Sequence, residues 1–174
     1  MITAEYCRVM ARYNAWQNTQ MRAAMRALSY RALTEERGAF FGSILKTANH
    51  LLWGDTIWMS RFDGWPKPQG GISSSVAFMP DFAMWDAARA QTDAKIIAWA
   101  LDLDEARLEG ALSWYSGAAQ RDVSKPMRFC IAHFFNHQTH HRGQIHAMLT
   151  QAGQATEDTD LFLLEPSEMP AEQS

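Results

Sequence analysis

Apolar residues recur every three or four positions along most of the chain, which is the spacing of a helix with one buried face. The pattern predicts four long helices, over residues 3–28, 40–63, 81–101 and 126–153. We expect Asp81 to cap the third helix and Pro126 to open the fourth, because these residue types suit those positions. Gly153 is expected to end the fourth helix, since glycine adopts the left-handed conformation found there.

Two segments interrupt the helical pattern. Residues 64–80 are rich in proline, glycine and serine, which indicates a long connection. Such a connection is needed when two successive helices of a bundle run in the same direction. Residues 107–125 alternate loosely and turn at Ser116-Gly117, which predicts a small β-hairpin. The expected fold is therefore an all-α four-helix bundle with a β-hairpin before the last long helix.

Length and composition fit this fold and narrow the function. A chain of 174 residues with 47% hydrophobic and 20% charged residues is typical of one globular domain, which we place at residues 1–165. The remaining residues, 166–174, form an acidic tail. The net charge of −3 gives no basic excess that would favour nucleic acid or a membrane surface as a partner.

The prediction of the cellular compartment rests on the membrane-spanning and signal segments that the sequence does not show. No apolar run is long enough to span a bilayer, and residues 1–14 carry charge without an apolar signal core. Cys7 and Cys130 cannot build a disulfide framework, and both are expected to act as small core residues. We therefore expect a cytoplasmic protein.

The histidines are the most informative residues of the sequence. Five of the six lie in the last predicted helix, namely His133, His137, His140, His141 and His146. Helical residues four apart lie about 6 Å apart at Cβ and can share a metal ion, whereas residues eight apart cannot. Two pairs are usable, His133 with His137 and His137 with His141. The apolar stripe of the helix favours the second pair, because it directs those side chains into the bundle.

His50 is the natural third ligand, because it is the only histidine on another predicted helix. Catalytic zinc sites commonly combine three protein ligands with a water molecule. Periodicity leaves two possibilities open for His50, since its mixed face, with Ser43, Thr47 and Gly54, could line a cavity or meet solvent. No HExxH motif is present because Gln138 follows His137, which disfavours a zincin-type protease.

Three segments of the chain resemble the DinB/YfiT-like family. HFFNHQTHHRGQIHAML looks like the family's C-terminal signature, in which HxxxHRGQ lies on the last bundle helix. YNAWQN, at residues 13–18, looks like the motif of its first helix, and NHLLWGDTIWMSRF, at residues 49–62, looks like its second helix. The resemblance spans nearly the whole chain, up to about residue 165.

The resemblance implies a bundle in the order up-down-down-up and a metal site formed by His50, His137 and His141. It also implies zinc or nickel as the metal and a homodimer as the assembly. Gln144 becomes a candidate to contact a metal ligand or the substrate, and Arg142 is expected in helix packing and a surface ion pair. Asp55 is expected to hold a partner on the first helix, such as Asn14 or Trp16, instead of a metal.

The function implied by the resemblance is metal-dependent transfer to or from a low-molecular-weight thiol, such as bacillithiol or mycothiol. Three neutral imidazoles leave a divalent ion its full charge and an open position, so a bound thiol or water would lose its proton more readily. Two other hypotheses stay open from the sequence. One is a non-catalytic, metal-binding stress-response protein, and the other is a metal-dependent hydrolase.

Overall fold

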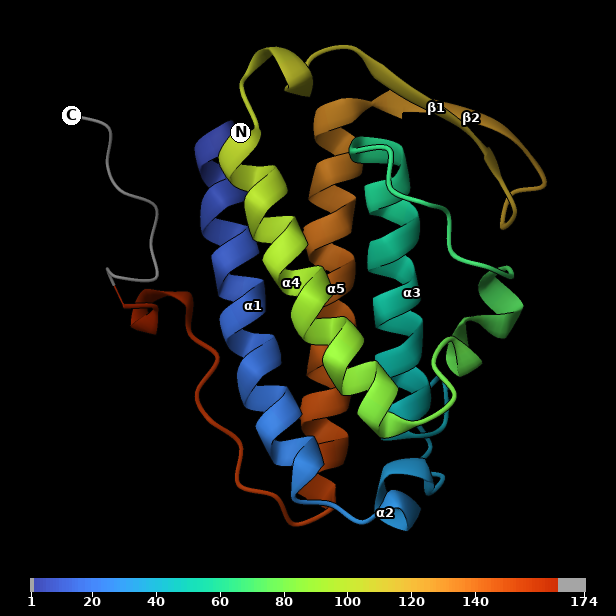
Figure 1. Ribbon diagram of the computed structural model, residues 1–174, viewed down its shortest axis with the longest axis vertical. Helices are drawn as coiled ribbons and strands as arrows, with labels where there is room; N and C mark the ends of the chain where they lie inside the picture. The colour runs from blue at the N-terminus through green and yellow to red at the C-terminus, as the bar shows by residue number, and fades with distance from the viewer. Residues whose placement is uncertain (1, 166–174) are drawn as a thin grey trace.

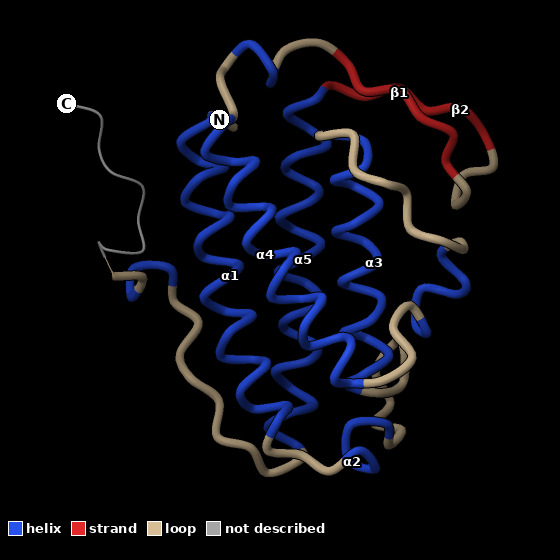
Figure 2. Tube along the Cα trace, in the orientation of Figure 1, coloured by secondary structure: helices blue, strands red, loops and turns tan. Residues whose placement is uncertain are grey.

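The computed structural model describes residues 2–165, which are mostly helical with one small two-stranded antiparallel sheet (Figures 1 and 2). The predicted acidic tail lies outside the described residues. Five α-helices are present in the described chain: α1 (Ala4–Arg26), α2 (Tyr30–Thr34), α3 (Ile44–Phe62), α4 (Phe82–Asp102) and α5 (Met127–Gln151). Three short 3₁₀ turns accompany them: η1 (Ile72–Ala77), η2 (Ala106–Leu108) and η3 (Leu161–Leu163).

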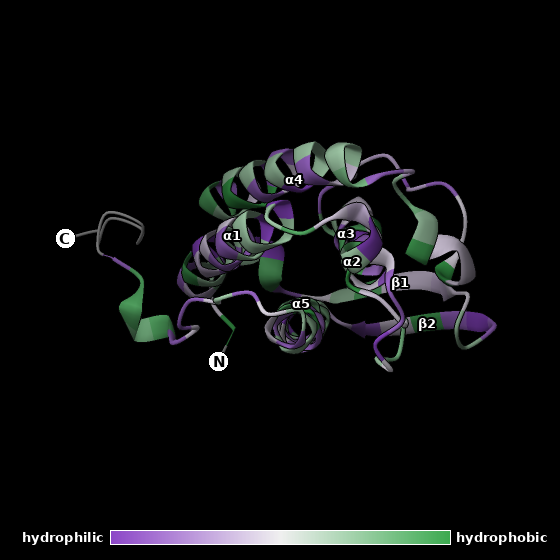
Figure 3. Cartoon of the chain, turned by 90° about the horizontal axis from the view of Figure 1, so that it is seen from below, coloured by the Kyte–Doolittle hydropathy of each residue, from purple (hydrophilic) through white to green (hydrophobic). Residues whose placement is uncertain are grey.

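The four long helices lie side by side. In Figure 1, α1 and α5 run downwards and α3 and α4 run upwards. Seen from below, α1 and α3 each lie between α4 and α5 (Figure 3). Because α3 and α4 run the same way, the chain between them must return along the bundle, and residues 63–81 with η1 form this long connection. None of the described helices is long and apolar enough to cross a membrane.

Side-chain caps set the first residue of three long helices. Thr3, Ser43 and Asp81 each accept a hydrogen bond from a backbone N–H in the first turn of α1, α3 and α4. The prediction that Asp81 caps a helix is confirmed. The prediction that the second long helix begins at residue 40 is wrong, because Ser43 caps it and Gly42 takes a left-handed φ of 83° just before the cap.

Two further differences concern short elements. The five-residue helix α2 was not predicted, because one turn is too short to show a periodic pattern. The hairpin is confirmed, with β1 (Ala111–Ser116) paired to β2 (Arg121–Pro126). Pro126 ends β2 and stands one residue before α5, so it precedes the first turn that it was predicted to open. Gly153, with φ of 80°, follows the end of α5 as expected.

The core consists of two apolar clusters with polar residues between them. One cluster lies toward the hairpin end and includes Cys7, Met59, Trp99 and Phe134. The other lies at the opposite end and includes Met25, Leu52, Trp85 and Ile145. Along each long helix, a few buried polar positions separate the two clusters. These residues, which we call the polar layer, are Asn14, Asn18, Asp55, Arg89, Asp93 and Gln138.

Candidate metal centre

Three histidines from two helices meet beside the polar layer. His50 of α3 and His137 and His141 of α5 each offer one ligand atom, and these atoms all lie within 4.8 Å of one another. The closest pair is Nε2 of His50 and Nε2 of His137, which are 3.3 Å apart. In the part of the chain that the structure describes, no other His, Cys, Asp or Glu joins this cluster or forms a second one. His50 is buried, so its mixed helix face lines the interior and does not meet solvent.

A glycine of α3 makes room for the ring of His137. A Cβ atom built on Gly54 would lie 2.8 Å from Cε1 of His137, closer than such atoms approach in folded proteins. Glycine in a helix interior costs about 1 kcal/mol relative to alanine. Gly54 therefore has a steric reason to stand in α3, because any side chain would displace His137 from the other two imidazoles.

Hydrogen bonds orient two of the three imidazoles. The hydroxyl of Ser75 donates to the carbonyl of Ile72, so its oxygen is left to accept a hydrogen bond from Nδ1 of His50 at 2.8 Å. The side-chain oxygen of Gln144 accepts from Nδ1 of His141, also at 2.8 Å. Both Nδ1 atoms then carry a proton, so the Nε2 atoms of both rings keep their lone pairs for a ligand.

Burial keeps the imidazoles neutral. It lowers the pKa of His50 to about 4, with a smaller contribution from His141 nearby. It lowers the pKa of His137 to about 3, where the neighbouring histidines add to the effect. The pKa of His141 is also lowered by burial. At neutral pH all three rings are therefore uncharged, which is the form that binds metal ions.

The donor set fits a divalent metal ion. A tetrahedral zinc ion with Zn–N bonds of about 2.0–2.1 Å holds its ligand nitrogens about 3.3 Å apart, close to the separation of His50 and His137. Phe41 covers the cluster, with its ring centroid 4.1 Å from that of His50 and 5.5 Å from that of His141. The three histidines could hold a metal ion through imidazole nitrogens, which suit zinc, copper, iron and nickel.

The other histidines lie away from this point of convergence. His133 and His140 are exposed, and His146 is partly exposed and binds Thr156. The ring of His133 packs against Trp58, with centroids 5.0 Å apart. The choice of His137 and His141 over the pair with His133 therefore agrees with the arrangement of the side chains.

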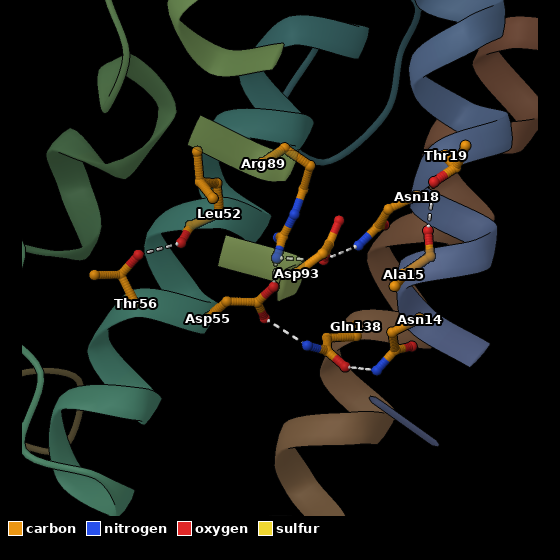
Figure 4. Close-up of polar contacts among 10 residues, drawn as sticks. All are labelled: Asn14, Ala15, Asn18, Thr19, Leu52, Asp55, Thr56, Arg89, Asp93 and Gln138. Carbon is orange, nitrogen blue, oxygen red and sulfur yellow. Dashed lines mark hydrogen bonds and ion pairs between the residues drawn. The ribbon is translucent and has the colours of Figure 1, made fainter. Parts of the chain in front are cut away.

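The side chains of the polar layer form hydrogen bonds and ion pairs with one another (Figure 4). Arg89 binds Asp55 at 2.5 Å and Asp93 at 2.7 Å, and all three side chains are buried. Gln138 donates to Asp55 at 3.0 Å and accepts from Asn14. The expected direct contact from Asp55 to the first helix is therefore wrong, because Gln138 stands between Asp55 and Asn14.

Two expectations for the HRGQ segment have different outcomes. Gln144 contacts His141, as described above. Arg142 makes no surface ion pair, because it is buried against Tyr13 and the only hydrogen bond of its guanidinium within residues 2–165 is a long one to Thr139. Burial lowers the pKa of Arg142 to about 10. The expected role of Arg142 in helix packing therefore agrees with the structure, whereas the expected surface ion pair is wrong.

Three contributions to this region were not predicted: the hydrogen bonds of Ser75 and of Gln138, and the steric role of Gly54. Ser75 lies in the connection, where periodicity gives no information, and Gln138 was used only to exclude a protease motif. Gly54 carries a usable signal, because a glycine four residues after a histidine in a helix is costly unless something packs against it.

Comparisons with known proteins find a matching family, a similar sequence and a similar fold. The model of the DinB family matches residues 1–173 of the chain. The chain is similar to "Protein DinB" of Bacillus subtilis (strain 168), with 28% identity over 165 residues, which cover 87% of this chain and 88% of that protein. Its fold is similar to the crystal structure of a DinB-like protein from Bacillus cereus, with a TM-score of 0.60 and 16% identity. That match covers 82% of this chain and 90% of the other.

Proposed function

The chain belongs to the DinB family, and on this basis we propose that it is a metal-dependent transferase that uses a low-molecular-weight thiol. His50, His137 and His141 would hold the metal ion. The observation that supports this proposal most directly is the convergence of three neutral imidazoles within 4.8 Å, two of them oriented by hydrogen bonds at Nδ1.

A divalent ion bound there would lower the pKa of a coordinated thiol, so that the thiolate is available at neutral pH. The protein's own residues have two roles. Ser75 and Gln144 fix the imidazole rings, and Phe41 shields the cluster from water. In the overall reaction the thiol sulfur bonds to an electrophilic carbon of the substrate, and the leaving group takes up the proton that the thiol loses.

The number of protein ligands favours a site for chemistry over a purely structural one. Structural zinc sites usually have four protein ligands, whereas catalytic sites have three and keep a position for water or substrate. Within residues 2–165 the cluster has three. A small molecule therefore has a position at which to bind.

The family membership extends the proposal in several respects. We assign the four long helices to the family's up-down-down-up bundle, within one domain at residues 1–165. We further infer a homodimer in the cytoplasm, zinc or nickel as the metal, and a small molecule as the substrate. Light scattering on the purified protein tests the dimer, and the mass of a monomer would exclude it.

The central experiment is elemental analysis of untagged protein, followed by thermal-shift measurements with small thiols. We expect about one zinc or nickel ion per chain, and we expect thiols to raise the melting temperature only of the metal-loaded form. Protein treated with a chelator serves as the control. Metal without thiol binding would favour the stress-response or hydrolase hypothesis, and absence of stoichiometric metal would contradict all three hypotheses.

A further inference from the structure

A hollow of about 340 Å³ lies between the C-terminal half of α3 and the hairpin. Its charged lining residues are Arg61 of α3 and Lys67 of the following connection, and no carboxylate lines it. The remaining walls are apolar or weakly polar and include Ile57, Trp114 and Tyr115. A concave surface with positive charge and aromatic walls suits a small anion attached to an apolar body.

Arg61 is held in place by aromatic rings and has no acidic partner. Its Cζ lies 4.5 Å from the ring centroid of Trp58 and 5.1 Å from that of Trp114. Among residues 2–165, no hydrogen bond or ion pair engages its guanidinium, whereas Arg22, Arg89 and Arg128 all bind carboxylates. Contacts to the ring faces leave the in-plane N–H groups available, and these groups match a carboxylate in geometry.

Partial burial strengthens the attraction of Arg61 for an anion, compared with an arginine on the open surface. Arg61 is neither fully exposed nor fully buried, and burial lowers its pKa. A desolvated guanidinium gains more from an anionic partner than one in bulk water, because the surrounding dielectric constant is lower. The hairpin supplies Trp114, so this element, which is separate from the four long helices, contributes to the hollow.

The hollow and the histidine cluster share one face of α3. Gly54, which touches His137, comes seven residues before Arg61 in α3. Seven residues bring a helix back to the same face about 10 Å further along its axis. Ring contacts connect the two places, since Trp58 packs on His133 and His133 lies 5.8 Å from His137. Because these rings fill the space between the two places, a molecule that reaches both would lie over the rings of Trp58 and His133.

We propose that Arg61, with Trp58 and Trp114, binds the carboxylate of a small molecule whose thiol or reacting group lies at the three-histidine cluster. This inference rests on the proposed function, which it deepens by naming an acidic substrate or thiol. Along α3, Arg61 lies about 10 Å beyond Gly54 and about 16 Å beyond His50, so the carboxylate and the reacting group would be roughly 10–16 Å apart. Short acids, in which the two groups are adjacent, cannot satisfy both places.

The test uses zinc-loaded full-length protein and a series of mercaptocarboxylates of increasing chain length, from mercaptoacetate to mercaptoundecanoate. Each is compared by calorimetry with the mercaptoalcohol of the same length. We expect the longer carboxylates of the series to bind roughly tenfold more tightly than the matched alcohols, in line with a charge-assisted hydrogen bond. The shortest pair should show little difference.

Two variants assign the effect to a residue. Arg61→Gln should remove the preference for carboxylates while keeping the zinc content and the affinity for mercaptoalcohols. Arg121→Gln removes one positive charge from the other strand of the hairpin and should leave the preference unchanged. A preference that survives Arg61→Gln but disappears in Lys67→Gln would overturn the inference, because the neighbouring lysine would then bind the anion.

The design separates this inference from the proposed function. If mercaptoalcohols bind and carboxylates gain nothing at any length, the role of Arg61 is refuted and the thiol chemistry stands. Phenylpropionate, which has no thiol, completes the series. If it binds in an Arg61-dependent way while no thiol binds, the thiol chemistry fails and the anion site stands. If neither class of molecule binds, both are refuted.

Discussion

Two polar clusters lie side by side in the middle of this protein, and their residues are neighbours in sequence. His137 and Gln138 are consecutive on α5, yet the first belongs to the histidine cluster and the second to the polar layer. In the polar layer one arginine is bound by two carboxylates, so its positive charge is paired inside the protein. In the histidine cluster three neutral acceptors face one another, which is a donor set for a cation.

The difference shows how burial alone fails to identify function. Both clusters are largely buried and both join separate helices, but only one has ligand atoms that converge on a common point. The polar layer is expected to determine stability and helix register, and the histidine cluster is expected to determine ligand binding. Variants in the two clusters should therefore affect different measurements.

The largest expected effect is on metal content. His137→Ala or His141→Ala removes one of three ligands, and we expect bound metal to fall from about one ion per chain to nearly none by elemental analysis. His133→Ala, His140→Ala and His146→Ala are matched controls on the same helix and should keep the metal. Loss of metal in His146→Ala with retention in His141→Ala would contradict the assignment of the ligands.

The next effect is on stability. Arg89→Met leaves Asp55 and Asp93 buried without their cation, and removing one partner of a buried ion pair costs about 3–5 kcal/mol. Urea denaturation of the metal-free protein measures this loss. Arg107→Met is the control, because Arg107 also binds two carboxylates but is partly exposed, so it should cost less than about 1 kcal/mol. Equal losses in the two variants would contradict the distinction.

A smaller effect is expected from the residues that orient the imidazoles. Gln144→Ala removes the acceptor for Nδ1 of His141, and loss of such a partner typically weakens metal binding about 10–100-fold. Competition with a chelator of known affinity measures this change. Gln154→Ala, outside α5, serves as the control. An unchanged affinity in Gln144→Ala would mean that the ring of His141 is fixed by packing alone.

The last effect, which is the smallest near neutral pH, is on the pH dependence of stability in the metal-free protein. In the unfolded chain a histidine has a pKa near 6.5, whereas His137 in the folded protein has a pKa of about 3. Below about pH 6.5 the unfolded state therefore binds a proton that the folded state does not, and stability falls toward pH 3.

His137→Gln should reduce this slope by up to about 1.4 kcal/mol per pH unit, as measured by urea denaturation at several pH values. His140→Gln is the exposed control and should leave the slope as it is. Parallel curves for the wild type and His137→Gln would show that the imidazole is not desolvated in the folded protein.

Much of the helical structure could be predicted from the sequence, because long amphipathic helices repeat their signal over several turns. The hairpin and the ends of α4 and α5 were predicted from turn and cap residues close to their observed positions. The start of α3 was misplaced because Phe40 and Phe41 match the apolar period, although Ser43 carried the capping signal. Local capping chemistry takes precedence over periodicity at such a boundary.

The candidate site was predictable only in part, for a different physical reason. The spacing of His137 and His141 lies within one helix, so rotation per residue is enough to pair them. The contacts of Asp55 with Arg89 and of His50 with Ser75 cross between elements, and no single-helix pattern contains that information. His50 was a candidate ligand because it is the only histidine on another helix, and the resemblance to a family supported it, but neither gave an indication of Ser75.

The space left by Gly54 has a consequence for recognising similar proteins. A homologue could keep both histidines of the HxxxH pair and the histidine of α3. It would still be unable to assemble the cluster if a bulkier residue stood four positions after the histidine of α3. A screen of genomes for this kind of centre should therefore require the glycine of α3 together with the three histidines. Chains that lack it would form a group in which the bundle is retained and its chemistry has been lost or replaced.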